Sequence, residues 1–369
     1  MNVEELQSQT IRWMRFPLAV AIVYSHNLTW ELQQTLSPFE WSSLSITDLY
    51  HIVCTTVSGV LARIARPCFF IFSGFLFFNN IKEWNKQTYF KKIKSRIKTL
   101  VVPYLLWNSI AVIVVASYYL LRTEYGPQFL TELWENGILK IFWNYHAEGG
   151  WNDIFGVAVV SHYPFNATMW FIRDLILLIF LSPLIYYFLK YSKLVGVIIL
   201  GFGFYALART FSNAIFFFCI GAYFSIHGKN MIIELRKWKI FWFIIAAITM
   251  LLSIYYKTKT NFLPIFIVTG AISTIIIVSG FIEKGKIDAK NKVVTFFAKT
   301  SFFIFATHTV LLLEWSRRLV DVIIKFECTL FLIIKYLATP LVCVSICVGL
   351  YYAANKISPK IMNVLTGSR

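Results

Sequence analysis

The sequence predicts an all-α protein, a polytopic membrane helix bundle with about ten transmembrane helices. Of its 369 residues, 58% are hydrophobic and 14% are charged, whereas an ordinary soluble chain carries about 25% charged residues. Apolar runs long enough to cross a bilayer, which takes about 20 residues, recur along the whole chain. These two observations argue against a soluble globular protein.

The candidate spans follow one another without a low-complexity linker or an internal repeat. We therefore expect a single membrane domain over residues 1–369, with no appended soluble domain. The fifth and sixth candidates are short and poorly separated, which leaves a count of nine spans open. The ten candidates lie approximately at 11–28, 55–80, 99–121, 169–189, 194–208, 212–227, 239–256, 262–282, 298–314 and 329–354.

Basic residues indicate how the spans are oriented. The chain has 35 Lys and Arg against 18 Asp and Glu, a formal net charge of +17, which in a soluble chain would suggest a nucleic-acid partner. When alternate connections are compared and basic residues at the ends of spans are counted with them, 23 basic residues fall on the side of the N-terminus, 8 on the other side and 4 within spans. Because Lys and Arg accumulate in cytoplasmic loops, we expect both termini in the cytoplasm of a multi-pass cell-membrane protein. No nucleic-acid partner is expected.

The cysteines and the N-terminus add two negative expectations. Cys68, Cys219, Cys343 and Cys347 lie within apolar runs, and no Cys or His spacing typical of a metal site or disulfide framework occurs. They are expected to be small buried hydrophobic residues. The first ten residues are acidic and no small-residue cleavage site follows, so a cleaved signal peptide is not expected.

Two connections on the outer side are long enough to carry function. Residues 29–54 contain acidic residues and no basic ones, while residues 122–168 are rich in aromatic residues, including Trp134, Trp143 and Trp151. The aromatic content favours an ordered segment. It is expected to be either a helix lying at the outer membrane surface or a surface on which sugars stack.

Ionisable groups within a span are costly, which makes each of them a functional candidate. The first span holds Arg15 near its start and His26 near its end. Eleven residues with a rise of about 1.5 Å each separate the two by roughly 16 Å on one helix face. The arginine is thus expected at the cytoplasmic entrance and the histidine in the outer half.

The second span carries Arg63 and Arg66 three residues apart, on one helix face. Two neighbouring guanidinium groups repel each other unless an anion lies between them, so a phosphate or similar ligand is a natural partner. The alternative is that these arginines reach the outer surface or pair with Asp174.

Further polar residues follow within the spans. Ser73 and Gly74 are small residues whose first interpretation is close helix packing. Arg173 and Asp174 are adjacent and do not share a helix face, so each is expected to pair across the bundle. His308 is the one histidine inside a late span, where it either forms a structural hydrogen bond or takes part in function.

A basic run, Lys91 to Lys98, precedes the third span in what we expect to be a cytoplasmic loop, and it leads into Pro103 and Tyr104. It is expected to anchor the protein on anionic lipid. A basic rim of this kind would also attract a polyanionic nucleotide cofactor.

Taken together, these residues resemble the acyltransferase-3 family of integral-membrane acyltransferases. The family motif Arg, ten residues, His is matched by Arg15 and His26, and its Arg-x-x-Arg motif by Arg63 and Arg66. Further matches in the same order are Phe69 to Leu76, Arg96 to Tyr104, Trp170 with Phe171, and Ser301 to His308. The C-terminal esterase-like domain of some members is not expected here, and the glutamate that some branches carry after the Trp-Phe pair is missing.

The resemblance implies transfer of an acyl group, most simply acetyl, from cytoplasmic acyl-CoA to a hydroxyl of a cell-surface or lipid-linked carbohydrate. It implies His26 as general base or transient acyl carrier, acting with Arg15. The expected partners are acyl-CoA, the glycan acceptor and membrane lipids, without a permanently bound cofactor or a metal. The implied donor-binding residues are Arg15, Arg96 and Tyr104, and the implied substrate-binding residues are Arg63, Arg66, Ser73, Trp170, Arg173 and His308.

Two other functions remain compatible with the residues alone. Intramembrane Arg and His could line the pathway of a polysaccharide or lipid-intermediate transporter that performs no covalent chemistry. A small-molecule sensor is the third alternative. A histidine placed beside an arginine pair around one cavity would favour the enzyme.

Overall fold

The computed structural model is a helical bundle with one short strand pair, and six of its helical stretches are long and apolar enough to cross a membrane. It describes residues 2–28, 44–81, 83–122, 124–135, 137–145, 153–154, 157–158, 163–207, 210–256 and 261–367. The six stretches are Asp48–Phe78, Lys86–Arg122, Ser182–Ala206, Phe262–Glu283, Lys292–Ile323 and Thr329–Ile357. The protein is therefore a polytopic membrane bundle.

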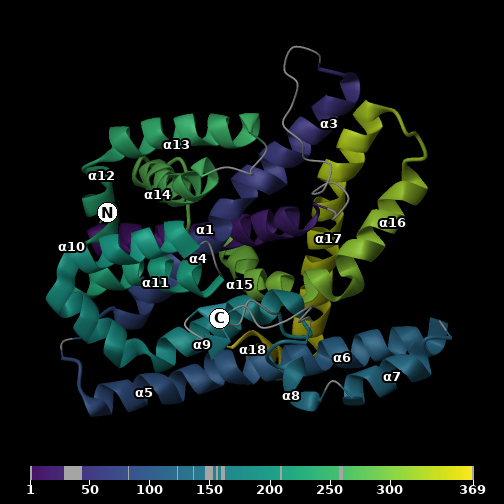
Figure 1. The fold of residues 1–369 in the computed structure, drawn as a ribbon, viewed down its shortest axis with the longest axis horizontal. Helices are drawn as coiled ribbons and strands as arrows, with labels where there is room; N and C mark the ends of the chain where they lie inside the picture. The colour runs from purple at the N-terminus through teal and green to yellow at the C-terminus, as the bar shows by residue number, and fades with distance from the viewer. Residues whose placement is uncertain are drawn as a thin grey trace.

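Helix α1 (Val3–His26) lies in the middle of the bundle, as Figure 1 shows. It contacts α4 (Ala65–Phe78), α14 (Phe262–Glu283), α15 (Lys292–Thr307) and α17 (Thr329–Ile357). Its mean hydropathy is lower than that of the six long stretches because its first 13 residues include four charged ones, Glu4, Glu5, Arg12 and Arg15. Its central position places both ends of the Arg15 to His26 segment among other helices.

The remaining helices surround this centre (Figure 1). Helices α13 (Lys239–Tyr255) and α14 pack together, and α16 (Leu313–Ile323) runs beside α17. The other elements are α3 (Ile46–Cys54), α5 (Lys86–Arg96), α6 (Val102–Arg122), α7 (Gly126–Glu135), α8 (Ile138–Ile141), α9 (Trp170–Phe180), α10 (Ser182–Leu207), α11 (Thr210–Ile226), α12 (Met231–Arg236) and α18 (Pro359–Thr366).

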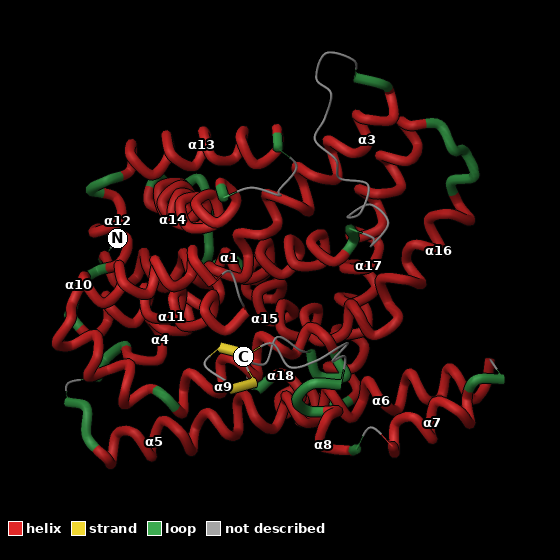
Figure 2. Tube along the Cα trace, in the orientation of Figure 1, coloured by secondary structure: helices red, strands yellow, loops and turns green. Residues whose placement is uncertain are grey.

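The connection at 122–168, which the charge count predicts to be on the outer side, contains both helix and strand. Helix α7 is amphipathic, with Phe129 buried against α6 while Trp134 is exposed. An antiparallel pair of two-residue strands, β1 (Asp153–Ile154) and β2 (Val157–Ala158), is the departure from an all-helical chain (Figure 2). Trp151, and the first part of the 29–54 connection, lie outside the described residues.

The basic run Lys91 to Lys98 is helical, which corrects the expectation of a loop. Asn85 caps α5 by accepting a hydrogen bond from the backbone N–H of Thr88 (2.9 Å). A π-helical turn at Ile97–Val101 then joins α5 to α6 without interruption. Lys and Arg favour helix, so a charged sequence that resembled a loop extends the third span instead.

Other boundaries also move. The second span begins in α3, within the segment expected to be an outer connection. The fourth and fifth candidates, 169–189 and 194–208, correspond to α9 followed by α10, which bends at Lys193 (φ 52°, ψ −132°). The ninth candidate continues past 314 into α16. The second and ninth candidates are longer because helical hydrogen bonding continues beyond the apolar run, whereas the fourth candidate is divided because α9 ends at Phe180.

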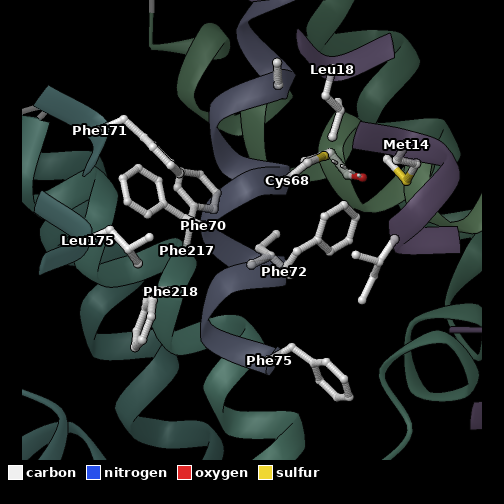
Figure 3. Packing of buried hydrophobic residues seen from close by; sticks show 14 of the residues in the cluster. Met14, Leu18, Cys68, Phe70, Phe72, Phe75, Phe171, Leu175, Phe217 and Phe218 are labelled. Atoms are coloured by element: carbon white, nitrogen blue, oxygen red, sulfur yellow. Dashed lines mark hydrogen bonds between the residues drawn. The ribbon is translucent and has the colours of Figure 1, made fainter. Parts of the chain in front are cut away.

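Helices α4 and α11 form the most closely packed pair in the core. Figure 3 shows Phe70 and Phe217 meeting beside Phe171, with Met14 of α1 on the other side of α4. A Cβ atom on Gly74 would overlap the carbonyl oxygen of Phe218, and one on Gly221 would overlap that of Ile71. The helix backbones are in direct contact, as expected for small residues in a membrane bundle.

Candidate active site

His26 and His308, from opposite ends of the chain, lie side by side inside the bundle. Their ring centroids are 5.2 Å apart and the ring planes are tilted by 58°. His26 is the last residue of α1 and its side chain is accessible to solvent, whereas His308 is completely buried. The pair thus consists of one solvent-accessible imidazole and one buried imidazole.

The two arginines of the second span lie close to this pair. Arg63 and Arg66 are both near enough to act electrostatically on the His26 ring. Arg63 lies in a 3₁₀ turn, Leu61–Ile64, that follows a π-helical turn at Thr55–Val60, and Arg66 lies in the first turn of α4. Irregular turns of this kind occur often at functional sites.

The charges of these arginines are not neutralised by any carboxylate in the described part of the chain. The guanidinium carbon of Arg66 lies 5.7 Å from the centroid of the Trp170 ring. The buried Nε of Arg63 has no hydrogen-bond partner among the same residues. A buried cation without a counter-ion is costly, so the arrangement suits an anion or a developing negative charge supplied by a ligand.

Arg173 and Asp174 do not pair across the bundle, which corrects the sequence expectation. They form an ion pair with each other (2.9 Å), and both Nε and Nη2 of Arg173 donate to Oδ1 of Asp174. A third nitrogen, Nη1, donates to the carbonyl oxygen of Trp143 (2.8 Å). The long arginine side chain folds back far enough to reach its neighbour. Asp174 is therefore not the partner of Arg63 or Arg66.

The chain around His308 departs from regular helix. Residues His308–Leu312 form a π-helical turn in which Val310 (φ −83°, ψ 74°) and Leu311 (φ 66°, ψ −20°) are non-helical. A positive φ is costly for leucine. Such strain is found at sites where function requires a particular geometry.

Two polar side chains donate hydrogen bonds to backbone carbonyl oxygens near this break in the helix. Nδ2 of Asn166 donates to the carbonyl oxygen of Ala306 (2.9 Å), and Oγ1 of Thr168 donates to that of Phe305 (3.1 Å). Nδ1 of His308 is 2.8 Å from the carbonyl oxygen of Ile304. Since a carbonyl can only accept, Nδ1 carries the proton, and Nε2 of a neutral His308 is an acceptor.

A cavity of about 200 Å³ lies between α1, α4, α9 and α15, nearer to Arg15 than to His26 along α1. Its walls are mainly apolar, and Arg15, Arg96 and Lys299 contribute cationic groups to its lining. Phe305, another lining residue, has its ring centroid 6.5 Å from that of His308. The cavity thus has a basic lining and comes near the histidine pair at Phe305, although His26, His308, Arg63 and Arg66 are not among its lining residues.

Arg15 also lines a second and wider cavity of about 920 Å³, together with Arg12 and Lys229. Ser73 lines the first cavity, between the phenylalanines of α4. Tyr104 lies elsewhere: its hydroxyl donates to the carbonyl oxygen of Phe142, and it is not among the described residues lining either cavity. Its expected role in donor binding stays a prediction.

Sequence reasoning missed three residues of this region. Lys299 enters the sequence analysis only as one of the 23 basic residues on the side of the N-terminus. Its position two residues before the Ser301 to His308 segment was a signal that it could belong to the site. Asn166 and Tyr163 carried no such signal. Asn166 donates a hydrogen bond to the carbonyl oxygen of Ala306 at the broken helix, and the ring of Tyr163 lies 6.5 Å from that of Trp170, which contacts Arg66.

Comparison with known proteins identifies the class. A family model described as an acyltransferase domain matches residues 9–352, which is most of the chain. The chain therefore belongs to the acyltransferase-3 family, and it is a membrane acyltransferase. The resemblance drawn from the sequence motifs is confirmed.

A curated relative matches over nearly the whole length. The succinoglycan biosynthesis protein ExoH of Rhizobium meliloti (strain 1021) is 25% identical over 388 aligned positions, which cover 98% of this chain and 92% of that protein. No solved structure matches this chain.

Proposed function

We propose that this protein transfers an acyl group, most simply acetyl, from cytoplasmic acyl-CoA to a hydroxyl of a cell-surface or lipid-linked carbohydrate. The observation that carries the proposal is the meeting of an accessible His26 with two arginines that lack counter-ions, beside an apolar cavity with a basic lining. The name of the relative, which refers to biosynthesis of a polysaccharide, supports a carbohydrate acceptor. The proposed location is the cell membrane.

The proposed orientation places both termini in the cytoplasm, with ten spans. Besides the six long stretches, α11 and α13 are shorter apolar helices, and α1 and α9 complete the count. In this orientation the basic residues Arg15, Arg96 and Lys299 face the donor side. His26 lies in the outer half, where it can meet an acceptor from outside.

The proposed donor site uses the two cavities lined by Arg15. The phosphates of acyl-CoA would contact Arg15, Arg96 and Lys299, because guanidinium and ammonium groups bind phosphate. The apolar walls would hold the pantetheine arm, which brings the thioester toward Phe305 and the histidine pair. No metal enters this scheme.

The proposed reaction is attack of the acceptor hydroxyl on the thioester carbonyl. His26 removes the hydroxyl proton as a general base, while Arg63 and Arg66 stabilise the negative charge that develops on the carbonyl oxygen. Nε2 of His308 is placed behind His26 to stabilise the imidazolium that forms. The carbon–sulfur bond then breaks, and the CoA thiolate recovers the proton from His26.

The test is the His26→Ala variant. Removal of a general base is expected to lower the rate of transfer by about 10²–10⁴-fold, at unchanged membrane expression. Mass spectrometry of surface glycans and lipids checks the loss of an acyl mass, and release of CoA by purified protein gives the rate.

A matched control is His227→Asn, which changes a histidine in the segment after α11 whose Nε2 is 3.0 Å from the carbonyl oxygen of Leu189. This variant is expected to keep the wild-type rate. Transfer at the wild-type rate by His26→Ala would disprove the proposed role. A glycan that fails to reach the surface, with its acyl groups unchanged, would instead indicate a transporter.

A further inference from the structure

A separate cavity of about 320 Å³ lies on the outer side, between α6, α7 and the broken helix after His308. Its volume is within the range of small-molecule binding sites. Five aromatic side chains line it, three from α6, α7 and the turn between them and two from the segment before α9: Tyr119, Tyr125, Phe129, Tyr145 and Phe165. It shares no lining residue with the two basic cavities.

The aromatic rings hold one another in place. The centroid of Tyr119 lies 5.3 Å from that of Tyr125 and 5.1 Å from that of Phe129. Across the cavity, Tyr145 and Phe165 are 4.8 Å apart, and Phe165 is 6.3 Å from Phe129. These distances are typical of packed aromatic pairs. The cavity is therefore preformed. Its lining side chains lose little conformational entropy when a ligand binds.

The polar groups of this cavity favour a neutral ligand. Glu132 accepts hydrogen bonds from the Tyr125 hydroxyl and from Nε2 of Gln128 (2.9 Å). The hydrogen bond to Glu132 raises the pKa of Tyr125 to about 12, so that this hydroxyl stays protonated. None of the described lining residues is Lys or Arg. A carboxylate without a balancing cation disfavours an anionic ligand.

The cavity is connected to the histidine pair through the chain itself. Thr309 and Val310, which directly follow His308, form part of its wall, and so does Asn166, which binds the carbonyl oxygen of Ala306. Oγ1 of Thr309 is buried and has no hydrogen-bond partner in the described ranges. An unsatisfied buried hydroxyl costs free energy, and a ligand hydroxyl in this cavity would satisfy it.

We infer that this cavity binds a neutral pyranose residue of the acceptor glycan, whose ring stacks on Tyr119 and Phe129 and whose hydroxyl groups bond to Thr309 and Glu132. The inference rests on the proposed function, since it assigns the acceptor to an outer site that is distinct from the basic donor cavities. A sugar fits because it offers apolar C–H faces together with hydroxyl groups that both donate and accept.

The test measures binding of oligosaccharides to the purified full-length protein, without acyl-CoA. The probes are fragments of the host's own surface polysaccharide after removal of acyl groups by mild base, separated into neutral and uronic-acid-bearing pools. Tyr119→Ala and Thr309→Val are each expected to weaken binding of the neutral pool by about tenfold or more. Tyr119→Phe keeps the ring and is expected to bind within about threefold of wild type.

Trp134→Ala is the matched control, because Trp134 lies on the same helix as Phe129 but is 75% exposed and outside the cavity. It is expected to bind like wild type. Wild type is expected to bind the uronic-acid pool less tightly than the neutral pool. Glu132→Gln is expected to bind the uronic-acid pool more tightly than wild type does. Equal affinity of wild type, Tyr119→Ala and Thr309→Val for the neutral pool would overturn the inference.

Measurements of CoA release distinguish a failure of this inference from a failure of the proposed function. The KM for the acceptor, measured by release of CoA, is expected to rise in Thr309→Val and to stay near the wild-type value in Trp134→Ala. If the wild type transfers no acyl group at all, the proposed function fails. If it transfers acyl groups and Thr309→Val has the wild-type KM, only the acceptor site is wrong.

Discussion

Asp174 shows how a single buried charge is neutralised within this bundle. It is 1% exposed, and its Oδ1 accepts two hydrogen bonds from Arg173, the preceding residue. Oδ2 has no hydrogen-bond partner among the described residues. The pair leaves Arg63 and Arg66 without a carboxylate, which is the electrostatic condition that the proposed chemistry needs.

The first prediction concerns this pair. Asp174→Ala removes the carboxylate that pairs with the buried Arg173 guanidinium, and we expect it to lower the free energy of unfolding by about 3–5 kcal/mol. Thermal unfolding of the detergent-solubilised protein measures the effect. The double variant Arg173→Met with Asp174→Leu is expected to recover most of the loss, because no charge then stays buried.

A matched control is Glu234→Ala, which breaks an ion pair with Lys237 on the surface of the protein. Surface pairs of this kind contribute about 0–1 kcal/mol, so its unfolding curve is expected to stay near that of wild type. If Asp174→Ala is as stable as Glu234→Ala, the buried pair is not a stabilising contact.

Among the helices, the contact between α4 and α11 fixes the helix that carries Arg66. Gly74 and Gly221 let the two backbones touch, and Ser225 adds a hydrogen bond to the carbonyl oxygen of Phe75 (2.7 Å). Since α4 also carries Ser73, this contact determines where one wall of the basic cavity lies. The packing role expected of the Ser-Gly pair thus belongs to Gly74, while Ser73 faces the cavity.

The second prediction follows from that contact. Gly221→Ala places a methyl group on the carbonyl oxygen of Ile71, so the helices must separate. Overpacking costs about 1–3 kcal/mol or more, and we expect less folded protein in the membrane together with reduced acyl transfer. Size-exclusion chromatography in detergent and CoA release give the two measurements.

Gly280→Ala is the control, because the space around Gly280 in α14 is open. Alanine favours helix over glycine by about 1 kcal/mol, so this variant is expected to be as stable as wild type or slightly more stable. Equal behaviour of Gly221→Ala and Gly280→Ala would contradict the close contact.

Considered as a whole, the molecule separates basic from aromatic surfaces. Arg15, Arg96 and Lys299 gather around cavities at one end, and the tyrosines of α6 and α7 gather around a cavity at the other. The histidine pair lies between them along α1 and α15. Such a division suits a protein that takes one substrate from each side of a membrane.

The third prediction tests the orientation of the whole chain. Among the six cysteines, Cys328 is exposed and the other five are buried. Cys328 precedes α17 on the side predicted to be outside, so a membrane-impermeant maleimide added to intact cells is expected to label the protein. Cys328→Ser is expected to abolish the labelling. Labelling that appears only after the membrane is permeabilised would reverse the proposed orientation.

Much of the fold was predictable because it depends on composition along the chain. Apolar runs located the spans, and the rise per residue placed Arg15 and His26 at different depths of α1. The positions of helix ends were less predictable. The basic run Lys91 to Lys98 is helical, since Asn85 and its good helix formers begin a helix where charge suggested a loop.

The sequence by itself determined the class of this protein, the bias of its charges and the spacing of Arg15 and His26 along one helix, because all three follow from residue type and helical rise. Only the tertiary structure decided that His308 stands beside His26, that Arg173 satisfies Asp174, and that a strained turn at Leu311 separates a basic cavity from an aromatic one. Those outcomes depend on which helices touch and on how buried polar groups find partners, and both are properties of the packed bundle.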